Sequence, residues 1–292
     1  MQPGTFIYRA AATSEIVAQA EKAAHGSANI LIEGAPGTGK TVLAEFIHTA
    51  GQRHGEIVTI DCAAGANPAS SFIECADGQS TLFLHGADEM TAAAQAELAM
   101  ALRTDAPSPR LVAASSRGLS EAARDGRFRE DLYYQLAVVT LHLPPLAERA
   151  DDIPALAAHF AARFATAHGM PPRALADDAL AALSAYRWPG NVRELENVIH
   201  RAVLFAEGDT IRAADISLSA APVEDGDGLS ASLVGRTVAD VERELILETL
   251  RHCGGNRTQA ADILGISVRT LRNKIRQYHE EGAEVPAFSR AA

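Results

Sequence analysis

The sequence predicts an α/β protein in which a parallel sheet comes first, an all-helical segment follows and a small all-α unit ends the chain. Short apolar runs alternate with helical stretches through the first half of the 292 residues, a pattern typical of a parallel sheet covered on both faces. From Asp151 to about Ala206 the pattern is helical throughout. Two short helices can be traced between Gly255 and Tyr278.

Five short apolar runs are the expected core strands, because each is separated from the next by a helical stretch. They are 29–32, 57–60, 81–84, 111–114 and 138–143. Helical spacing from Val42 to His48 predicts a helix shortly after the first strand. The parallel strands then place their carboxyl ends, and the residues that follow them, at one edge of the sheet.

The segment between the first strand and this helix, residues 34–41, fits the phosphate-loop pattern G-x-x-x-x-G-K-[ST]. In this pattern backbone N–H groups surround phosphate oxygens, the lysine reaches the outer phosphates and the last hydroxyl contacts Mg²⁺. The helix N-terminus also faces the phosphates. We therefore expect ATP or ADP with Mg²⁺ next to Thr41, and nucleotide contacts from Gly34, Gly37, Thr38, Gly39, Lys40 and Thr41.

The helices near the C-terminus form a basic helix-turn-helix pattern. Five basic residues (257, 269, 272, 274 and 276) against one acid (262) give five minus one, a local charge of +4. Leu271 and Ile275 are expected to face inward, one turn apart. Double-stranded DNA is the expected partner, since the second helix of this motif reads the major groove. The predicted DNA contacts are Arg269, Thr270, Arg272, Asn273, Lys274 and Arg276.

Within that helix, Arg269 and Arg272 are the expected base readers because they lie nearer its start. Lys274 and Arg276 are expected to contact phosphate. A solvated basic helix at the end of a chain is the alternative.

Two further segments precede this motif. An amphipathic helix over 238–253 predicts a dimer contact, and the acidic, Pro- and Gly-containing stretch 217–236 predicts a flexible linker.

Composition excludes several other classes of protein. The net charge of −11 argues against nucleic-acid binding over the whole surface. No run approaches the roughly 18 apolar residues of a membrane span, and residues 1–4 do not begin a secretory signal. The three cysteines lack the spacing of metal ligands and are expected to be reduced. A cytoplasmic location without membrane contact is therefore expected.

Several motifs resemble the AAA+ domain of sigma-54-dependent transcriptional activators, the bacterial enhancer-binding proteins of NtrC type. They are residues 61–64, 76–78 before 81–84, 126–134, 143–146 with 148–149, and 188–195. The C-terminal pattern resembles the Fis-type helix-turn-helix of the same proteins. The resemblance implies a AAA+ core, a helical lid and DNA-bound oligomers. It also implies that Arg193 touches nucleotide from the lid and that Arg129 is a candidate arginine finger.

The sequence departs from this family at the positions that carry hydrolysis. Where the family has Asp-Glu after the third strand, this chain has His85 and Gly86. Neutral imidazole is a poor ligand for a hard cation, and glycine offers no side chain. Asp88 and Glu89 follow, and we interpret them as the polar start of the helix running through Gln95 and Leu98. A bulge that returns Asp88 to the sheet edge is the alternative.

Other family positions are also altered. The sensor-one asparagine is replaced by Ser116, and the second arginine-finger position is Gln135, which has no charge for a phosphoryl group. Arg129 and Arg193 are present, although ion pairs with Asp131 and Glu194 are an alternative role for them. Only residues 65–75 separate the motif at 61–64 from that at 76–78, so the Gly-Ala-Phe-Thr-Gly-Ala loop that contacts the sigma factor is missing.

These features predict a transcription regulator that binds DNA and ATP but hydrolyses ATP poorly, if at all. The match to the family begins near Phe6, so no receiver domain is expected. Contact with sigma-54 polymerase is doubtful, and modulation of an intact family member by a homo- or hetero-oligomer is the leading hypothesis. The alternatives are an ATPase that uses Asp88 or Asp61 as a substitute acid, and a plain DNA-binding repressor. The expected domain boundaries are 1–150, 151–216, 217–236, 237–281 and 282–292.

Overall fold

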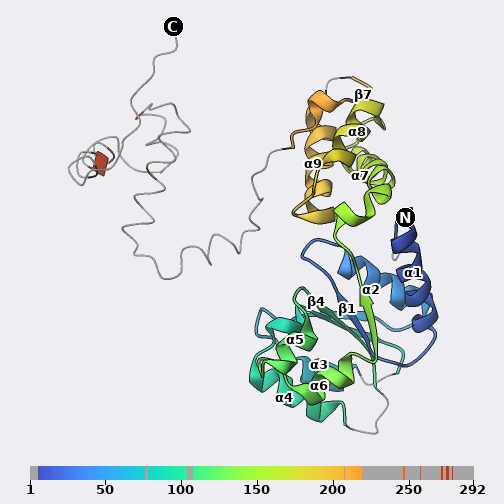
Figure 1. The fold of residues 1–292 in the computed structure, drawn as a ribbon, viewed down its shortest axis with the longest axis vertical. Coiled ribbons are helices and arrows are strands. Elements are labelled where there is room, and N and C mark those ends of the chain that lie inside the picture. The colour runs from blue at the N-terminus through green and yellow to red at the C-terminus, as the bar shows by residue number, and fades with distance from the viewer. Residues whose placement is uncertain are drawn as a thin grey trace. The chain divides into compact units, whose positions relative to one another are not determined.

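The computed structural model describes residues 6–75, 78–103, 108–206 and 208–218, together with six single positions in the C-terminal region (246, 257, 271, 274, 275 and 278). The chain divides into two compact units, 1–222 and 223–292. The fold below is that of the first unit, and Figure 1 labels its α-helices and three of its strands.

A five-stranded parallel sheet forms the centre of this unit, in the order β2-β3-β4-β1-β5. The strands are β1 (Ile30–Glu33), β2 (Ile57–Asp61), β3 (Thr81–His85), β4 (Arg110–Ser115) and β5 (Val139–His142). Each predicted strand is confirmed, and so is the α/β class. The register places Asp61 beside His85 and Glu33 beside Ser115, so the strand ends form one carboxyl edge.

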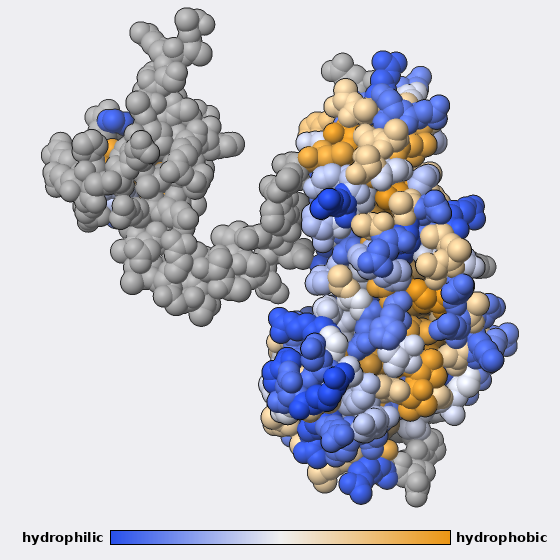
Figure 2. Space-filling view, in the orientation of Figure 1, coloured by the Kyte–Doolittle hydropathy of each residue, from blue (hydrophilic) through white to orange (hydrophobic). Residues whose placement is uncertain are grey.

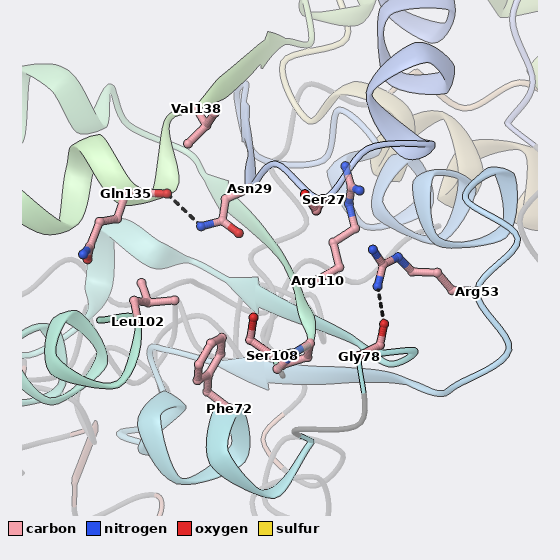
Figure 3. A pocket seen from close by; sticks show the side chains of 11 residues that line it. Ser27, Asn29, Arg53, Phe72, Gly78, Leu102, Ser108, Arg110, Gln135 and Val138 are labelled. Atoms are coloured by element: carbon pink, nitrogen blue, oxygen red, sulfur yellow. Dashed lines mark hydrogen bonds between the residues drawn. The ribbon is translucent and has the colours of Figure 1, made fainter. Parts of the chain in front are cut away.

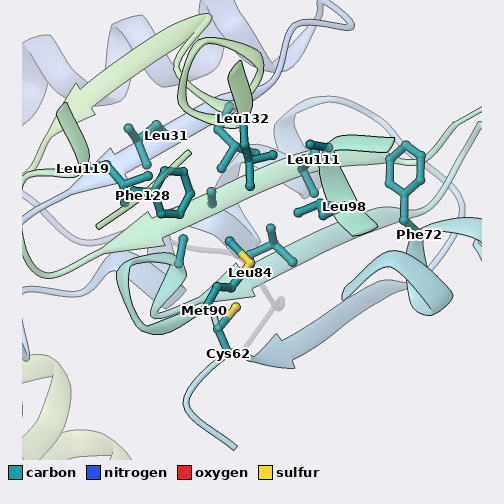
Figure 4. Packing of buried hydrophobic residues seen from close by; sticks show 14 of the residues in the cluster. Leu31, Cys62, Phe72, Leu84, Met90, Leu98, Leu111, Leu119, Phe128 and Leu132 are labelled. Atoms are coloured by element: carbon teal, nitrogen blue, oxygen red, sulfur yellow. The ribbon is translucent and has the colours of Figure 1, made fainter. Parts of the chain in front are cut away.

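Alternate residues of the strands face two separate apolar cores, as expected for strands buried on both faces. Leu82, Leu84 and Leu111 belong to the core on one face. They pack there with Leu98 and Leu132 from the covering helices and with Phe128 from a connection between two of these helices; Figure 4 labels all of them except Leu82. Phe83 and Val112 pack on the other face with α1 (Ala11–Ala24) and α2 (Lys40–Ala50). The first face is covered by α3 (Pro68–Glu74), α4 (Ala92–Ala101), α5 (Leu119–Arg124) and α6 (Glu130–Leu136).

The lid follows β5 and has its own apolar core. It comprises the 3-10 segment η2 (Leu146–Asp152), α7 (Ile153–Ala167), α8 (Asp177–Ala185), α9 (Asn191–Phe205) and the 3-10 turn η3 (Ala213–Asp215). The buried Trp188 donates its indole N–H to the Leu183 carbonyl at 2.8 Å. The expectation that 151–206 is helical throughout is wrong at one place. The two-residue strand β6 (Ala174–Leu175) pairs with β7 (Thr210–Ile211) and is too short to show a periodicity.

The first unit shows, on the face seen in Figure 2, polar side chains interspersed with apolar ones. Its large exposed apolar residues are Val42, Ile73, Met100, Tyr134, Val138, Leu204 and Phe205. Exposed apolar residues spread over several elements are normal for a folded domain. Within the described part of the chain, no helix is both long and apolar enough to cross a membrane.

A buried charge network joins the lid to the segment before α1. Asp152 is fully buried and accepts hydrogen bonds from the backbone of Arg9, from Ala10 N at 2.7 Å and from Thr13 Oγ1 at 2.7 Å. The guanidinium of Arg149, almost fully buried, lies 3.6 Å from the same carboxylate. Asp152 therefore satisfies three donors and one buried cation at once.

Replacing Asp152 by alanine leaves the buried guanidinium of Arg149 without its counter-ion and three donors without their acceptor. We expect the free energy of unfolding to fall by about 3–5 kcal/mol, the usual cost of breaking a buried ion pair from one side. Chemical denaturation followed by the fluorescence of Trp188, the one tryptophan of the chain, measures it. The neighbouring Asp151 is exposed, so Asp151→Ala should change stability by only about 0.5 kcal/mol. Equal effects of the two variants would contradict this reading.

Candidate functional site

The phosphate loop leaves the carboxyl end of β1 and enters α2, as its motif requires. Lys40 is the first residue of α2, and its ammonium donates to Gly34 O at 2.6 Å, Ala35 O at 3.0 Å and Ser116 Oγ at 3.0 Å. Burial lowers the pKa of Lys40, the nearby charge of Asp88 acts in the opposite direction, and the charge of Arg193 lowers it further. The structure thus brings the predicted nucleotide contacts Lys40 and Arg193 near each other, with Ser116, which replaces the sensor-one asparagine, bound to Lys40.

Three consecutive carbonyls of the loop are held by the lid. Pro36 O accepts from Asn191 Nδ2 at 2.9 Å. Gly37 O accepts from the backbone of Val192 at 2.9 Å and of Arg193 at 3.3 Å. The carbonyl of Thr38 accepts from the buried guanidinium of Arg149. The lid therefore touches the backbone that would surround a phosphate.

Glycine is required at position 37 for two reasons. Its φ of +75° lies in the left-handed region, and a Cβ there would lie 2.4 Å from Gly190 O in the lid. Asn191 also has a positive φ, of 54°. Its side-chain oxygen accepts from Leu146 N at 2.8 Å while its amide holds Pro36 O. Asn191 thus fastens the loop both to the lid and to the connection that follows β5.

The end of β3 carries no carboxylate. His85 is half-buried and its ring lies edge-on to Phe83, with 6.2 Å between centroids. Gly86 follows with a φ of 69°. Asp61, at the end of β2, is exposed, and its Oδ1 accepts from Ala63 N at 3.1 Å.

The interpretation of Asp88 and Glu89 as the start of the next helix is wrong. They lie in a separate 3-10 turn, η1 (Ala87–Glu89), whereas α4 begins at Ala92 and is capped by Thr91. Asp88 Oδ1 accepts from Ser115 Oγ at 2.9 Å and from Ser116 N at 3.1 Å. The acid therefore returns to the carboxyl edge, by a left-handed glycine and a 3-10 turn instead of a bulge.

The candidate arginine finger lies at the N-terminus of α6 and is paired. Arg129 donates to both oxygens of Asp131, at 3.0 and 2.9 Å, and both side chains are about half exposed. This hydrogen-bonded pair raises the pKa of Arg129 and lowers the pKa of Asp131. The ion pair given as an alternative is present, and a role for Arg129 toward a neighbouring subunit stays a prediction.

Sequence reasoning missed three residues that shape the site: Arg149, Asn191 and Glu33. The first two lie inside the family motifs, but their partners are more than 100 residues away along the chain. Glu33 ends β1, where its Oε1 accepts from Leu119 N at 2.9 Å and its Oε2 lies 3.2 Å from His142 Nδ1. No short-range signal in the sequence predicts these contacts.

A cavity of about 520 Å³ lies at the opposite, amino edge of the sheet (Figure 3). Arg110 and Arg53 line it, and none of its described lining residues carries a carboxylate. Arg110 is buried and donates to carbonyls that end α1, including Ala23 O at 2.7 Å. Gln135, which replaces the second arginine finger, lines this cavity, and its backbone carbonyl accepts from Asn29 Nδ2 at 2.8 Å.

Most of the predicted DNA-contact residues lie outside the described residues: Arg269, Thr270, Arg272, Asn273 and Arg276. The linker 217–236 lies outside them from position 219 onward. Lys274 is helical and half-buried, and Leu271 and Ile275 are buried, as their predicted inward orientation requires.

Family models match three successive stretches of the chain. Residues 7–146 match a sigma-54 interaction domain, 147–230 a AAA+ ATPase lid domain and 237–278 a bacterial regulatory protein of the Fis family.

The relatives are transcriptional regulatory proteins. FlbD of Caulobacter vibrioides is 38% identical, covering 96% of this chain and 71% of its own length. ZraR of Salmonella typhimurium is 36% identical, covering 86% of this chain and 64% of its own. NtrC of Azospirillum brasilense is also 36% identical, covering 85% and 64%. The match to FlbD extends over 326 residues, more than the 292 of this chain, so FlbD carries insertions that this chain lacks.

Solved structures agree with the fold. NtrX of Brucella abortus, crystallised with ADP, superposes with a TM-score of 0.65 at 24% identity over 94% of this chain and 69% of its own. RuvB, the Holliday junction branch migration motor of Thermotoga maritima, gives 0.53 at 18% identity over 91% and 85%.

Cys62 provides a probe of the acidic carboxyl edge. Burial, followed by the charges of Asp61, Asp88 and Glu89, raises the pKa of its thiol to about 12. At pH 8 it stays protonated, so we expect slow alkylation by iodoacetamide, because the thiolate is the nucleophile. The half-buried Cys75 should react faster. Peptide mass spectrometry over time distinguishes the two thiols, and equal rates in the native protein, or faster labelling of Cys62, would count against this geometry.

Proposed function

The chain belongs to the sigma-54-dependent transcriptional regulators, and on that basis we propose that it is a DNA-binding regulator gated by bound ATP or ADP. In this proposal it acts on transcription by assembling with an intact member of the family. It does not drive promoter opening alone.

DNA binding is assigned to the Fis-type helix-turn-helix, because residues 237–278 match the Fis family of bacterial regulatory proteins. The residues proposed to carry it are Arg269, Thr270, Arg272, Asn273, Lys274 and Arg276. Arg269 and Arg272 are proposed to read bases, and Lys274 and Arg276 are proposed to contact phosphate. The local charge of +4 in an acidic protein supports this assignment.

Gating by nucleotide is carried by one observation: the lid holds the carbonyls of Pro36, Gly37 and Thr38. A phosphate bound by the N–H groups of this loop would shift the backbone whose carbonyls accept hydrogen bonds from the lid. The proposed nucleotide contacts are Gly34, Gly37, Thr38, Gly39, Lys40, Thr41 and, from the lid, Arg193. NtrX of Brucella abortus has been crystallised with ATP and with ADP, which supports the ligand class.

The family's contact with the sigma factor has little room in this chain. β2 ends at Asp61 and α3 spans only Pro68–Glu74, so the connection that would carry the contact loop is short. Because assembly and DNA-binding elements remain, we propose a modulator that joins an intact partner, with domain boundaries near 150, 216, 236 and 281.

Mixing the protein with an intact NtrC-type activator tests this proposal. We expect a change in the partner's ATPase rate, oligomer size and promoter occupancy. Arg129→Ala should weaken these effects, because Arg129 is the residue proposed to reach a neighbouring nucleotide. The matched control is Arg127→Ala, since Arg127 is likewise exposed and pairs with a nearby acid, Asp125, at 3.0 Å. An unchanged partner in all three measurements would argue decisively against co-assembly.

A second candidate is an ATPase, and one observation favours it. A Cβ built on Gly86 would lie 3.8 Å from both Cδ and Oε2 of Glu89. The carboxyl group of Glu89 therefore lies close to where a glutamate side chain at position 86 would begin. Such a group could orient a water molecule for attack on a phosphate.

Phosphate release by the purified protein separates the two candidates. The leading proposal predicts no release above that of Lys40→Ala, because β3 ends without a carboxylate. The second predicts turnover that both Lys40→Ala and Glu89→Gln abolish. Turnover that Lys40→Ala abolishes and Glu89→Gln leaves intact would show that Glu89 does not orient the water. The same result would also contradict the proposal of a hydrolysis-deficient regulator.

A further inference from the structure

The chain reverses direction immediately after β3, and this reversal decides which acid reaches the carboxyl edge. Gly86 has φ 69° and ψ 45°, a left-handed conformation that residues with a Cβ rarely adopt. Glu89 N then donates to Gly86 O at 2.8 Å and closes the 3-10 turn η1. Asp88, at the centre of this turn, is thereby directed back toward the end of β4.

The two oxygens of the Asp88 carboxylate have different surroundings. Oδ1 accepts from Ser115 Oγ at 2.9 Å and from Ser116 N at 3.1 Å. Oδ2 is buried and has no hydrogen-bond partner among the described residues. A buried carboxylate oxygen without a partner costs free energy, so an unfilled contact remains at this position.

Asp88 lies next to the lysine of the phosphate loop. Ser116 connects the two: its N–H donates to Asp88 Oδ1, and its hydroxyl accepts from Lys40 Nζ at 3.0 Å. The groups that attract phosphate and the carboxylate are therefore held by one short segment at the end of β4. Holding Asp88 against β4 needs only Oδ1, so a purely structural role for the residue leaves Oδ2 unexplained.

A hard divalent cation fits this arrangement. Mg²⁺ binds proteins through one or two carboxylates together with substrate phosphates and water, not through an all-protein cage. In the described ranges, no cluster of three or more His, Cys, Asp or Glu could hold a metal by itself. Asp88 Oδ2 supplies one hard oxygen, directly or through water. Thr41, at the second position of α2, supplies the hydroxyl that the motif assigns to the metal.

We propose that Asp88, carried on the 3-10 turn η1, is the carboxylate that holds Mg²⁺ beside a bound nucleoside triphosphate in this chain. It replaces the acid that is missing at position 85. This inference rests on the proposed nucleotide binding, and it holds for both candidate functions, since each needs the metal and only the second needs Glu89.

Affinity for ATP, measured by calorimetry with Mg²⁺ and with EDTA, tests the inference without relying on turnover. We expect Mg²⁺ to tighten ATP binding by the wild-type chain. Asp88→Asn keeps the shape and the acceptor of Oδ1, and it should weaken the apparent Mg²⁺ affinity by about 10–100-fold. With EDTA the same variant should bind ATP at least as well as wild type, because a negative charge facing the phosphates is gone.

Two further variants and a second readout sharpen the test. Asp61→Asn makes the same change at the other acid of the carboxyl edge and should leave the Mg²⁺ effect in place. Ser115→Ala keeps the Asp88 carboxylate but removes one of its donors, so a smaller loss of Mg²⁺ affinity is expected. Mn²⁺, followed by electron paramagnetic resonance in the presence of ATP, should become immobilised on the wild-type protein and tumble mainly as the dissolved Mn·ATP complex with Asp88→Asn.

The outcomes separate failure of the proposed metal site at Asp88 from failure of the nucleotide binding on which it rests. Equal weakening of ATP binding with and without metal in Asp88→Asn would assign Asp88 a structural role and overturn the proposal. So would a metal effect lost in Asp61→Asn instead, or no metal effect in the wild-type chain. If wild-type protein bound no ATP under either condition, the proposed nucleotide gating itself would fail, and the inference with it.

Discussion

The site depends on the hydrogen bonds that the lid donates to three consecutive carbonyls of the phosphate loop, those of Pro36, Gly37 and Thr38. It requires backbone geometry that few residues can adopt. Gly37 is left-handed and touches Gly190 O too closely for a side chain, and Asn191 is left-handed as well. These hydrogen bonds use three carbonyls of the loop and none of its N–H groups, and the loop leads into a helix N-terminus, which attracts anions.

The same contact extends into the body of the lid through buried charge. Arg149 holds the carbonyl of Thr38 and lies beside Asp152, which in turn holds the backbone of Arg9 and Ala10. Separating a buried ion pair is costly, because it leaves a buried charge without its partner. The loop, the lid and the segment before α1 are therefore expected to move together. That coupling gives a nucleotide at the loop a physical route to surfaces distant from it.

Local patterns in the sequence were enough to predict the strands, the phosphate loop and the inward positions Leu271 and Ile275, since each depends on residues close together in the chain. The position of Asp88 was not predictable in this way. It follows from the sign of φ at Gly86, which composition and periodicity do not reveal. The roles of Asn191 and Arg149 were not predicted for a different reason. The carbonyls that they hold, those of Pro36 and Thr38, are more than 100 residues away along the chain.

In a parallel sheet the chemistry at the carboxyl edge depends on the path of the chain after each strand as much as on the last residue of the strand. A glutamate at position 86 would have to adopt a left-handed backbone, at a cost of roughly 1–2 kcal/mol, or else unwind the turn that carries Asp88. The backbone therefore does not readily accept the family's glutamate at 86 while keeping Asp88 at the edge. The loss of the glutamate at position 86 and the placement of Asp88 are therefore two consequences of a single glycine, and the chemistry of this edge depends on both.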